Sequence, residues 1–177
     1  MVIDEAYVDF ADSSAIELPR RCPNVIVLRS MSKGYSMAGL RLGFGVARPE
    51  ILTELMKVKD SYNVDALACA VGAAAVADQA YRNQCVAKVR ASLGLLSGQL
   101  EAMGFRVWPS QANFLLVCPP RAQAREIYEG LKKRGILIRY FQQPKLDDKL
   151  RISIGMADDN AQLVRAIGEI LARSGGG

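Results

Sequence analysis

The chain has 177 residues, half of them hydrophobic and 23% charged, with 23 Lys and Arg against 18 Asp and Glu. This composition is typical of a soluble globular protein of one domain or slightly more, and no run of about eighteen apolar residues indicates a transmembrane helix. Histidine is absent, which excludes His-based catalytic triads and His-ligated zinc sites.

Basic residues and thiols are spread along the chain. The one basic run, residues 132–134, closes a predicted amphipathic helix, where cations favour the helix dipole, so we expect no nucleic-acid partner. We interpret the cysteines as small buried apolar residues without the C-x-x-C spacing of a metal site: Cys22, Cys69, Cys85 and Cys118. With no secretory leader pattern at the N-terminus, these thiols favour a cytoplasmic location without a membrane partner.

Three short apolar segments predict strands in the first part of the chain: residues 2–4, 24–31 and 42–47. Continuously apolar strands of this kind are typical of a parallel sheet that is covered on both faces. Pro49 then begins an amphipathic helix, and Asp65 is the expected N-cap of an alanine-rich helix over 66–80. Because this second helix is apolar nearly all round, we expect it to be buried.

A long helix predicted over 82–103 ends at Gly104, and the pattern then changes. The rest of the chain predicts the order β-β-α-β-β-α: residues 105–108, 113–118, 122–134, 136–140, 150–154 and 158–172. Asp158 is the expected N-cap of the last helix. We therefore expect a portion of a large domain over 1–103, a small α+β domain over 104–174 and a disordered tail over 175–177.

Lys33 carries the strongest chemical signal in the sequence. It follows the second predicted strand, with Ser30 and Ser32 before it and Arg41 after it. A lysine amine forms Schiff bases with carbonyl compounds once its pKa is lowered, and hydroxyls with an arginine suit a phosphate. The pattern suggests an attachment point for pyridoxal phosphate, and the alternative is a surface lysine on a loop.

Asp4 and Tyr7 form a second cluster, in the run V-I-D-E-A-Y after the first predicted strand. Open α/β sheets bind ligands at the carboxyl ends of their strands. There Asp4 would pair with a protonated pyridine nitrogen, and Tyr7 would hydrogen-bond the ring oxygen. The alternative is that Asp4 and Glu5 merely cap a turn. The order of this run, S-x-S-K and a later arginine favours the cofactor site.

Together these motifs resemble the fold-type I pyridoxal-phosphate aminotransferases, most closely the histidinol-phosphate aminotransferases. The matching runs cover nearly the whole chain: residues 2–10 (VIDEAYVDF), 30–44 (SMSKGYSMAGLRLGF), 62–64 (YNV), 109–117 (PSQANFLLV), 135–139 (GILIR) and 150–155 (LRISIG). The resemblance implies an α/β fold, namely part of the three-layer large domain with its mostly parallel sheet, followed by a small C-terminal α+β domain.

The resemblance also implies individual roles. Lys33 would carry pyridoxal 5'-phosphate and move a proton between substrate and cofactor. The other cofactor contacts would come from the two strand ends and the following loop: Asp4, Tyr7, Ser30, Ser32 and Arg41. Arg139 and Arg151 would bind the phosphate end of the substrate, with a surface ion pair as the alternative for each. Apolar neighbours indicate that the strand of Arg151 is buried.

The chain departs from the family pattern in two places. Ser61 stands where the family commonly has proline before Y-N-V, which affects local backbone geometry only. The family's large domain begins well upstream of D-E-A-Y. That upstream region holds the phosphate-supporting glycine loop, the aromatic ring that stacks on the cofactor, an asparagine near the ring oxygen and a tyrosine that reaches the partner subunit. We therefore expect a truncated C-terminal portion of a homodimeric parent protein.

Three functional hypotheses follow. The parent protein would transfer an amino group between histidinol phosphate and 2-oxoglutarate or glutamate, a reaction of histidine biosynthesis. A related decarboxylase acting on threonine phosphate is the second reading, because that branch shares the lysine, aspartate and arginine motifs. The third is a non-catalytic fragment with an exposed strand edge. In each case we expect little or no transamination from this chain by itself.

Overall fold

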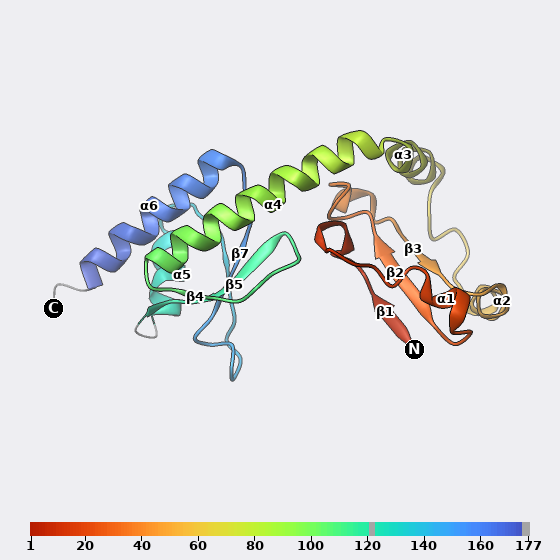
Figure 1. Ribbon diagram of the computed structural model, residues 1–177, viewed down its shortest axis with the longest axis horizontal. Coiled ribbons are helices and arrows are strands. Elements are labelled where there is room, and N and C mark those ends of the chain that lie inside the picture. The colour runs from red at the N-terminus through yellow and green to blue at the C-terminus, as the bar shows by residue number, and fades with distance from the viewer. Residues whose placement is uncertain (121–122, 175–177) are drawn as a thin grey trace. The chain divides into compact units, whose positions relative to one another are not determined.

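The first part of the chain combines a small sheet with several helices. The computed structural model describes residues 1–120 and 123–174 (Figure 1). The elements of this part are β1 (Val2–Asp4), the 3-10 helix η1 (Val8–Phe10), α1 (Leu18–Arg21), β2 (Ile26–Ser30), the 3-10 helix η2 (Ala38–Leu40), β3 (Gly43–Val46), α2 (Pro49–Val58) and α3 (Ala66–Ala77). The predicted strands and longer helices are confirmed, whereas α1, η1 and η2 were not predicted.

The first sheet has the order β1-β2-β3. β1 pairs in parallel with β2, which sets Asp4 opposite Leu28 and brings the carboxyl ends of both strands to one edge. β3 pairs antiparallel with β2, with Gly43 opposite Ser30. The prediction of a parallel, fully covered sheet is therefore wrong for β3, whose residues 43–45 are exposed. An apolar run favours a strand but does not fix its direction.

Helix α3 begins as the sequence predicts, because the Asp65 carboxylate accepts a hydrogen bond from the Ala68 amide at 2.7 Å. The helix is not buried, however. Only Ala68 and Gly72 are fully buried, while Leu67 and Val76 expose 68% and 45% of their surface. The prediction of a buried helix is wrong for this chain, because the described residues cover only one side of α3.

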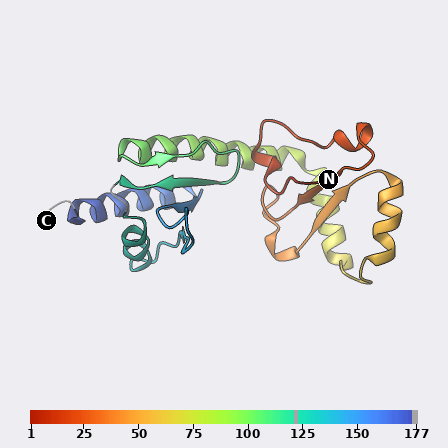
Figure 2. The ribbon, with the colours of Figure 1, turned by 90° about the horizontal axis from the view of Figure 1, so that it is seen from below.

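The second part of the chain forms a four-stranded antiparallel sheet in the order β4-β5-β7-β6. Its elements are α4 (Gln79–Ala102), β4 (Arg106–Val107), β5 (Phe114–Cys118), α5 (Ala124–Lys132), β6 (Arg139–Tyr140), β7 (Leu150–Ser153) and α6 (Ala157–Ser174) (Figure 2). Gly104 and Gly135 follow α4 and α5 with φ of 85° and 75°. Glycine adopts this left-handed conformation without a Cβ clash, which explains both predicted helix ends.

One continuous core lies between this sheet and helices α4, α5 and α6. Its fully buried members include Leu115 and Val117 of β5 and Leu150 and Ile152 of β7. Since alternate residues of a strand point to opposite faces, Phe114, Leu116 and Arg151 belong to the other face of the sheet. The burial of β7 that its apolar neighbours predicted is thus confirmed for one face only.

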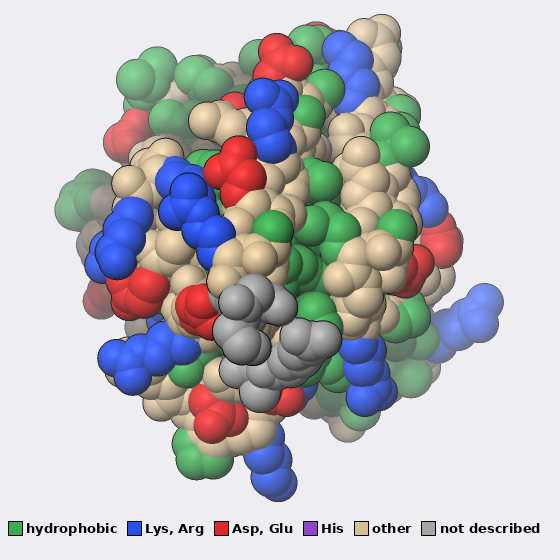
Figure 3. Space-filling view, turned by 90° about the vertical axis from the view of Figure 1, so that its left-hand side faces the viewer, with side chains coloured by type: hydrophobic (Ala, Val, Ile, Leu, Met, Phe, Trp, Pro, Cys, Tyr) green, Lys and Arg blue, Asp and Glu red, His purple; other side chains and the backbone are tan. Residues whose placement is uncertain are grey.

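The chain divides into two compact units, residues 1–87 and 88–177, with α4 running from one into the other. The domain boundary predicted after residue 103 stays a prediction. The expected disorder of residues 175–177 lies outside the described residues. Among the described helices, none is both long enough and apolar enough to cross a membrane. On the face seen in Figure 3, basic and acidic side chains are interspersed.

Two further expectations are corrected. All four cysteines are free, but Cys69 is exposed and the other three are half-buried, so they are not the buried residues predicted. Cys69 lies on α3, whose outer side is uncovered. Asp158 lies within the first turn of α6 and is not its cap. The Asp159 carboxylate instead accepts a hydrogen bond from the Met156 amide at 3.1 Å.

Candidate functional site

Lys33 lies in the loop that follows β2, and it is half-buried. The loop is closed by two backbone hydrogen bonds, from the Ser36 amide to the Lys33 carbonyl and from the Met37 amide to the Met31 carbonyl, both 3.0 Å. The Lys33 Nζ lies 5.7 Å from the centroid of the Tyr7 ring. The structure therefore brings together the amine and the phenol that the sequence singled out.

Asp4 ends β1 next to the end of β2, and its side chain is exposed. The Asp4 Oδ1 accepts a hydrogen bond from the Ala6 amide at 2.9 Å, which forms a tight Asx turn. The turn-capping role is therefore present. It uses one of the two carboxylate oxygens and fixes the orientation of the side chain at the sheet edge where ligands bind in α/β proteins.

The predicted phosphate ligands are held by their own loop. The Ser30 hydroxyl accepts a hydrogen bond from the Ser32 amide at 3.1 Å, and both side chains are half-buried. Arg41 has a left-handed backbone with φ of 54°, and its guanidinium donates to the Ala38 carbonyl at 2.8 Å. These contacts order the loop locally, but they do not join Arg41 to the serines.

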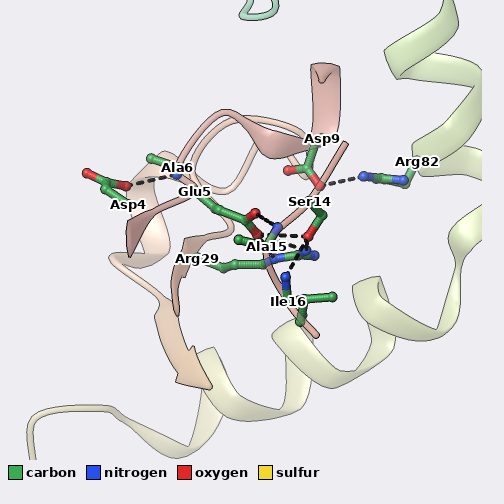
Figure 4. Close-up of polar contacts among 9 residues, drawn as sticks. All are labelled: Asp4, Glu5, Ala6, Asp9, Ser14, Ala15, Ile16, Arg29 and Arg82. Carbon is green, nitrogen blue, oxygen red and sulfur yellow. Dashed lines mark hydrogen bonds and ion pairs between the residues drawn. The ribbon is translucent and has the colours of Figure 1, made fainter. Parts of the chain in front are cut away.

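Glu5 and Arg29 form a network that the sequence did not reveal (Figure 4). The Glu5 Oε2 accepts from the Arg29 Nε at 3.1 Å and from the Ser14 hydroxyl at 3.1 Å, and the other carboxylate oxygen accepts from the Ala15 amide. With only 8% of its side chain exposed, Glu5 fastens the segment around Tyr7 to β2. In the sequence, the only sign of this network is Arg29, a charged residue inside the otherwise apolar strand β2.

A second such pair joins Asp9 of η1 to Arg82 in the first turn of α4 (Figure 4). The two residues are 73 positions apart, and no sequence pattern connects them. Asp9 is 8% exposed. Both ion pairs therefore hold the backbone around the Lys33 and Tyr7 side chains.

The second compact unit contains the two predicted substrate arginines. Arg139 of β6 lies directly opposite Arg151 of β7 in the antiparallel pairing. The Arg151 guanidinium lies 5.1 Å from the ring centroid of Phe114, and that of Arg139 lies 5.6 Å from Phe141. The Arg151 Nε is buried without a hydrogen-bond partner among the described residues. Like charges directly opposite on neighbouring strands repel, so this arrangement suits a bound anion.

A thiol and two charged residues lie elsewhere in the same unit. Burial raises the pKa of the Cys118 thiol, and the nearby Asp148 carboxylate raises it further. A hydrogen bond from Lys149 lowers the pKa of Asp148. Across the described ranges, 1–120 and 123–174, no three Cys, Asp or Glu side chains group as metal ligands would.

The candidate residues thus form two sets, one in each compact unit. The first set offers an amine for a carbonyl group, a carboxylate for a protonated ring nitrogen, a phenol and two hydroxyls. The second set offers two guanidinium groups for an anion. A cofactor that carries an aldehyde, a pyridine ring and a phosphate fits the chemistry of the first set.

Comparison with known proteins places the chain among aminotransferases. The family model for aminotransferase class I and II matches residues 1–167. The chain is 58% identical over 171 residues to histidinol-phosphate aminotransferase 1 of Trichormus variabilis, which covers 97% of this chain and 49% of that protein. The chain spans about half the length of the curated relatives it matches.

Solved structures share the fold over the same extent. The histidinol-phosphate aminotransferase of Sinorhizobium meliloti in complex with pyridoxal-5'-phosphate has a TM-score of 0.88 and 30% identity, covering 97% of this chain and 48% of that one. L-threonine-O-3-phosphate decarboxylase of Porphyromonas gingivalis has a TM-score of 0.77 at 24% identity, covering 97% and 55%. The second likeness concerns the fold alone.

Proposed function

Because the chain belongs to the class I and II aminotransferase family, we propose that it forms part of a pyridoxal-phosphate-dependent aminotransferase. The enzyme would transfer an amino group between histidinol phosphate and 2-oxoglutarate or glutamate. The observation that carries the proposal is the Lys33 amine, held 5.7 Å from the ring of Tyr7 at the end of the β1–β2 pair. The name of the 58% identical relative supports the choice of substrate.

In this proposal, different residues of the first unit bind different parts of the cofactor. When bound, pyridoxal phosphate supplies an electron sink that stabilises negative charge on the substrate carbon. Asp4 keeps the proton on the ring nitrogen by charge pairing, and Tyr7 hydrogen-bonds the ring oxygen. The phosphate is bound by the hydroxyls of Ser30 and Ser32 and by the guanidinium of Arg41.

Lys33 has two tasks in this proposal. Its Nζ first holds the cofactor through the carbonyl carbon, which requires the neutral amine. With substrate bound, the Lys33 Nζ would accept the proton from the substrate carbon and return it on the cofactor side. Tyr7 next to this amine limits the directions in which the flexible lysine side chain can point.

Arg139 and Arg151 would bind the phosphate of the substrate. Their opposed placement on β6 and β7 and the unpartnered Arg151 Nε support this role, because an anion would remove the charge repulsion and supply the absent acceptor. Phe114 and Phe141 beside the guanidinium groups restrict their motion and lower the entropy lost on binding.

Cofactor attachment can be tested on this chain directly. After incubation with pyridoxal phosphate and borohydride reduction, peptide mass mapping should find the label on Lys33 in preference to the exposed Lys57 and Lys59. Lys33→Ala should remove the preferred label, whereas Lys57→Ala should leave it. Equal labelling of all three lysines would refute the assignment of Lys33.

Phosphate binding can be tested separately with inorganic phosphate. The single tryptophan, Trp108, lies in the second unit, so its fluorescence reports the thermal unfolding of that unit. Phosphate should raise the Tm of the chain above its value in sodium chloride of equal ionic strength. Arg151→Met should abolish the shift, and Arg125→Met, which removes an exposed arginine of α5, should not. A shift that survives Arg151→Met would refute the site.

The choice between aminotransferase and decarboxylase needs a longer polypeptide. A chimera would join the half of the Trichormus variabilis relative that this chain does not cover to residues 1–177. We expect it to convert histidinol phosphate with 2-oxoglutarate and to leave threonine phosphate unchanged. We expect little or no transamination from the 177-residue chain alone. Release of carbon dioxide from threonine phosphate would favour the decarboxylase.

We also propose a cytoplasmic homodimer for the active enzyme. Its support is the exposed apolar surface around the start of α3, where Tyr62 is fully exposed and Val64 is 40% exposed. Exposed apolar patches of this kind commonly form protein interfaces. Sedimentation of the active chimera should give twice the monomer mass, and Tyr62→Ser should lower that mass.

A further inference from the structure

The carboxylate side chain of Asp9 is almost entirely buried, with 6% of its surface exposed. It lies in η1, which begins directly after Tyr7 and is closed by a hydrogen bond from the Phe10 amide to the Tyr7 carbonyl at 3.0 Å. Phe10 is itself buried, so the turn is fixed to the interior of its unit. A buried carboxylate needs a paired partner, because an unpaired charge carries a large desolvation penalty.

The partner is Arg82 of α4. Its Nη2 lies 2.5 Å from the Asp9 Oδ1, and its Nη1 donates to the Asn83 side chain at 2.8 Å. Its guanidinium carbon lies 5.8 Å from the Tyr35 ring centroid. The Arg82 side chain is 21% exposed. Gln79, one turn earlier on α4, donates to the Tyr35 hydroxyl at 3.2 Å. Tyr35 is therefore held by two residues of α4.

The Asp9 side chain also contacts the residue next to Lys33. A Cβ built on Gly34 would lie 2.3 Å from the Asp9 Oδ2 and 2.4 Å from its Cβ, closer than real Cβ atoms approach. The carboxylate thus packs directly against the Gly34 backbone, which is buried. Since the ion pair with Arg82 fixes Asp9, the carboxylate cannot move aside. Gly34 and Tyr35, which follow Lys33, are consequently restrained by the two members of the pair.

We propose that Asp9 and Arg82 are positioning residues for Lys33. By fixing the Gly34–Tyr35 backbone, the pair sets the direction from which the Lys33 Nζ approaches Tyr7 and the bound cofactor. Neither residue touches the reacting atoms. The inference rests on the proposed function for its catalytic meaning, but the restraint on the loop is a property of this chain and can be measured without cofactor.

Two measurements on the 177-residue chain test the pair. Amide hydrogen exchange at Ser36 and Met37, whose amides close the Lys33 loop, measures the restraint in the absence of cofactor. The share of borohydride-trapped pyridoxal phosphate on Lys33, relative to Lys57 and Lys59, measures its effect on the amine. Asp9→Asn keeps the shape and removes the charge, whereas Arg82→Lys keeps the charge and removes the planar contact with Tyr35.

A matched control is Arg48→Lys. Arg48 is also half-buried in the first unit, and its guanidinium donates to the carbonyls of Pro19 and Arg20 at 3.1 and 2.9 Å. This change weakens the unit away from the Lys33 loop. It separates a general loss of stability from a local effect on Lys33.

We expect Asp9→Asn to accelerate exchange at Ser36 and Met37 by about tenfold or more and to reduce selective trapping at Lys33 by a similar factor. Arg82→Lys should have a smaller effect on both, and Arg48→Lys should change neither. Unchanged exchange and trapping in Asp9→Asn, or equal changes in Arg48→Lys, would overturn the inference. If the unaltered chain shows no selective trapping, the proposed function fails, and the exchange data alone then decide whether the pair restrains the loop.

Discussion

The two compact units have similar lengths, but the second buries many more apolar side chains than the first. In the first unit, six hydrophobic residues are buried: Phe10, Val25, Val27, Met31, Ala68 and Val86. Among the described residues of the second unit, fourteen are buried in a single cluster. Large apolar residues on helices of the first unit remain exposed, among them Met56, Val58 and Leu67. The second unit therefore covers the apolar faces of its helices and sheet with its own residues, and the first unit leaves the apolar faces of its helices exposed.

The difference shows that the existence of an apolar helix face and the burial of that face are separate properties. Helix α2 shows the spacing of a surface helix with one apolar face, yet none of its residues is buried. Helix α5 shows the same spacing and buries Ala124, Ile127 and Leu131. The pattern predicts that a helix has an apolar face, but a second surface must be present to cover it. Four experiments test this contrast.

The largest expected difference concerns the loss of a leucine side chain. Leu131→Ala removes a fully buried side chain from the second unit and should lower the free energy of unfolding by about 3–4 kcal/mol. Leu67→Ala removes a side chain that is 68% exposed and should change it by less than about 0.5 kcal/mol. Urea unfolding followed by circular dichroism measures both. Similar losses for the two variants would contradict the contrast.

Backbone protection should differ between the two sheets. Amides of β5 and β7, which lie in the covered sheet, should exchange at least about 100-fold more slowly than those of β1 and β3. Local opening requires the least free energy where few apolar groups are buried. Native-state hydrogen exchange with mass spectrometry measures both sheets in one sample. Equal protection would show that the first unit is as stable as the second.

Within the first unit, ion pairs should matter more than apolar packing. Glu5→Gln leaves Arg29 without its charged partner and should destabilise the unit by about 2 kcal/mol, since Glu5 is nearly buried. Exchange at the Ala15 amide, which donates to Glu5, should accelerate. Glu54→Gln, in the exposed pair with Lys57, is the control and should have little effect. A larger effect of Glu54→Gln would refute this ranking.

The smallest expected effect is a gain in stability. A Cβ added at Gly94 or Gly98 of α4 meets no atom within 4 Å, so Gly94→Ala and Gly98→Ala should each stabilise the second unit by about 0.5–1 kcal/mol. The change should appear in Trp108 fluorescence during urea unfolding. As a control, Gly104→Ala should destabilise by about 1 kcal/mol, because its φ is 85°. Destabilisation by both helix variants would contradict this prediction.

The sequence identified the candidate site through residues that are close together along the chain. Ser30, Ser32 and Lys33 form one run, and Asp4 and Tyr7 form another, so strand ends and residue chemistry were enough to select them. The ion pairs that hold these runs were missed, because Glu5 and Arg29 are 24 positions apart. Charged residues occur at many positions, and only the fold determines which of them meet.

By itself, the sequence determined the longer elements and three of their ends, since Asp65, Gly104 and Gly135 act through hydrogen bonds and backbone angles within a few residues. It also determined which side chains are chemically suited to an aldehyde cofactor and an anionic substrate. Tertiary structure decided the antiparallel direction of β3, the exposure of α3 and the opposition of Arg139 to Arg151. Each of these depends on contacts between distant segments, and a local sequence pattern does not specify which distant segment it will contact.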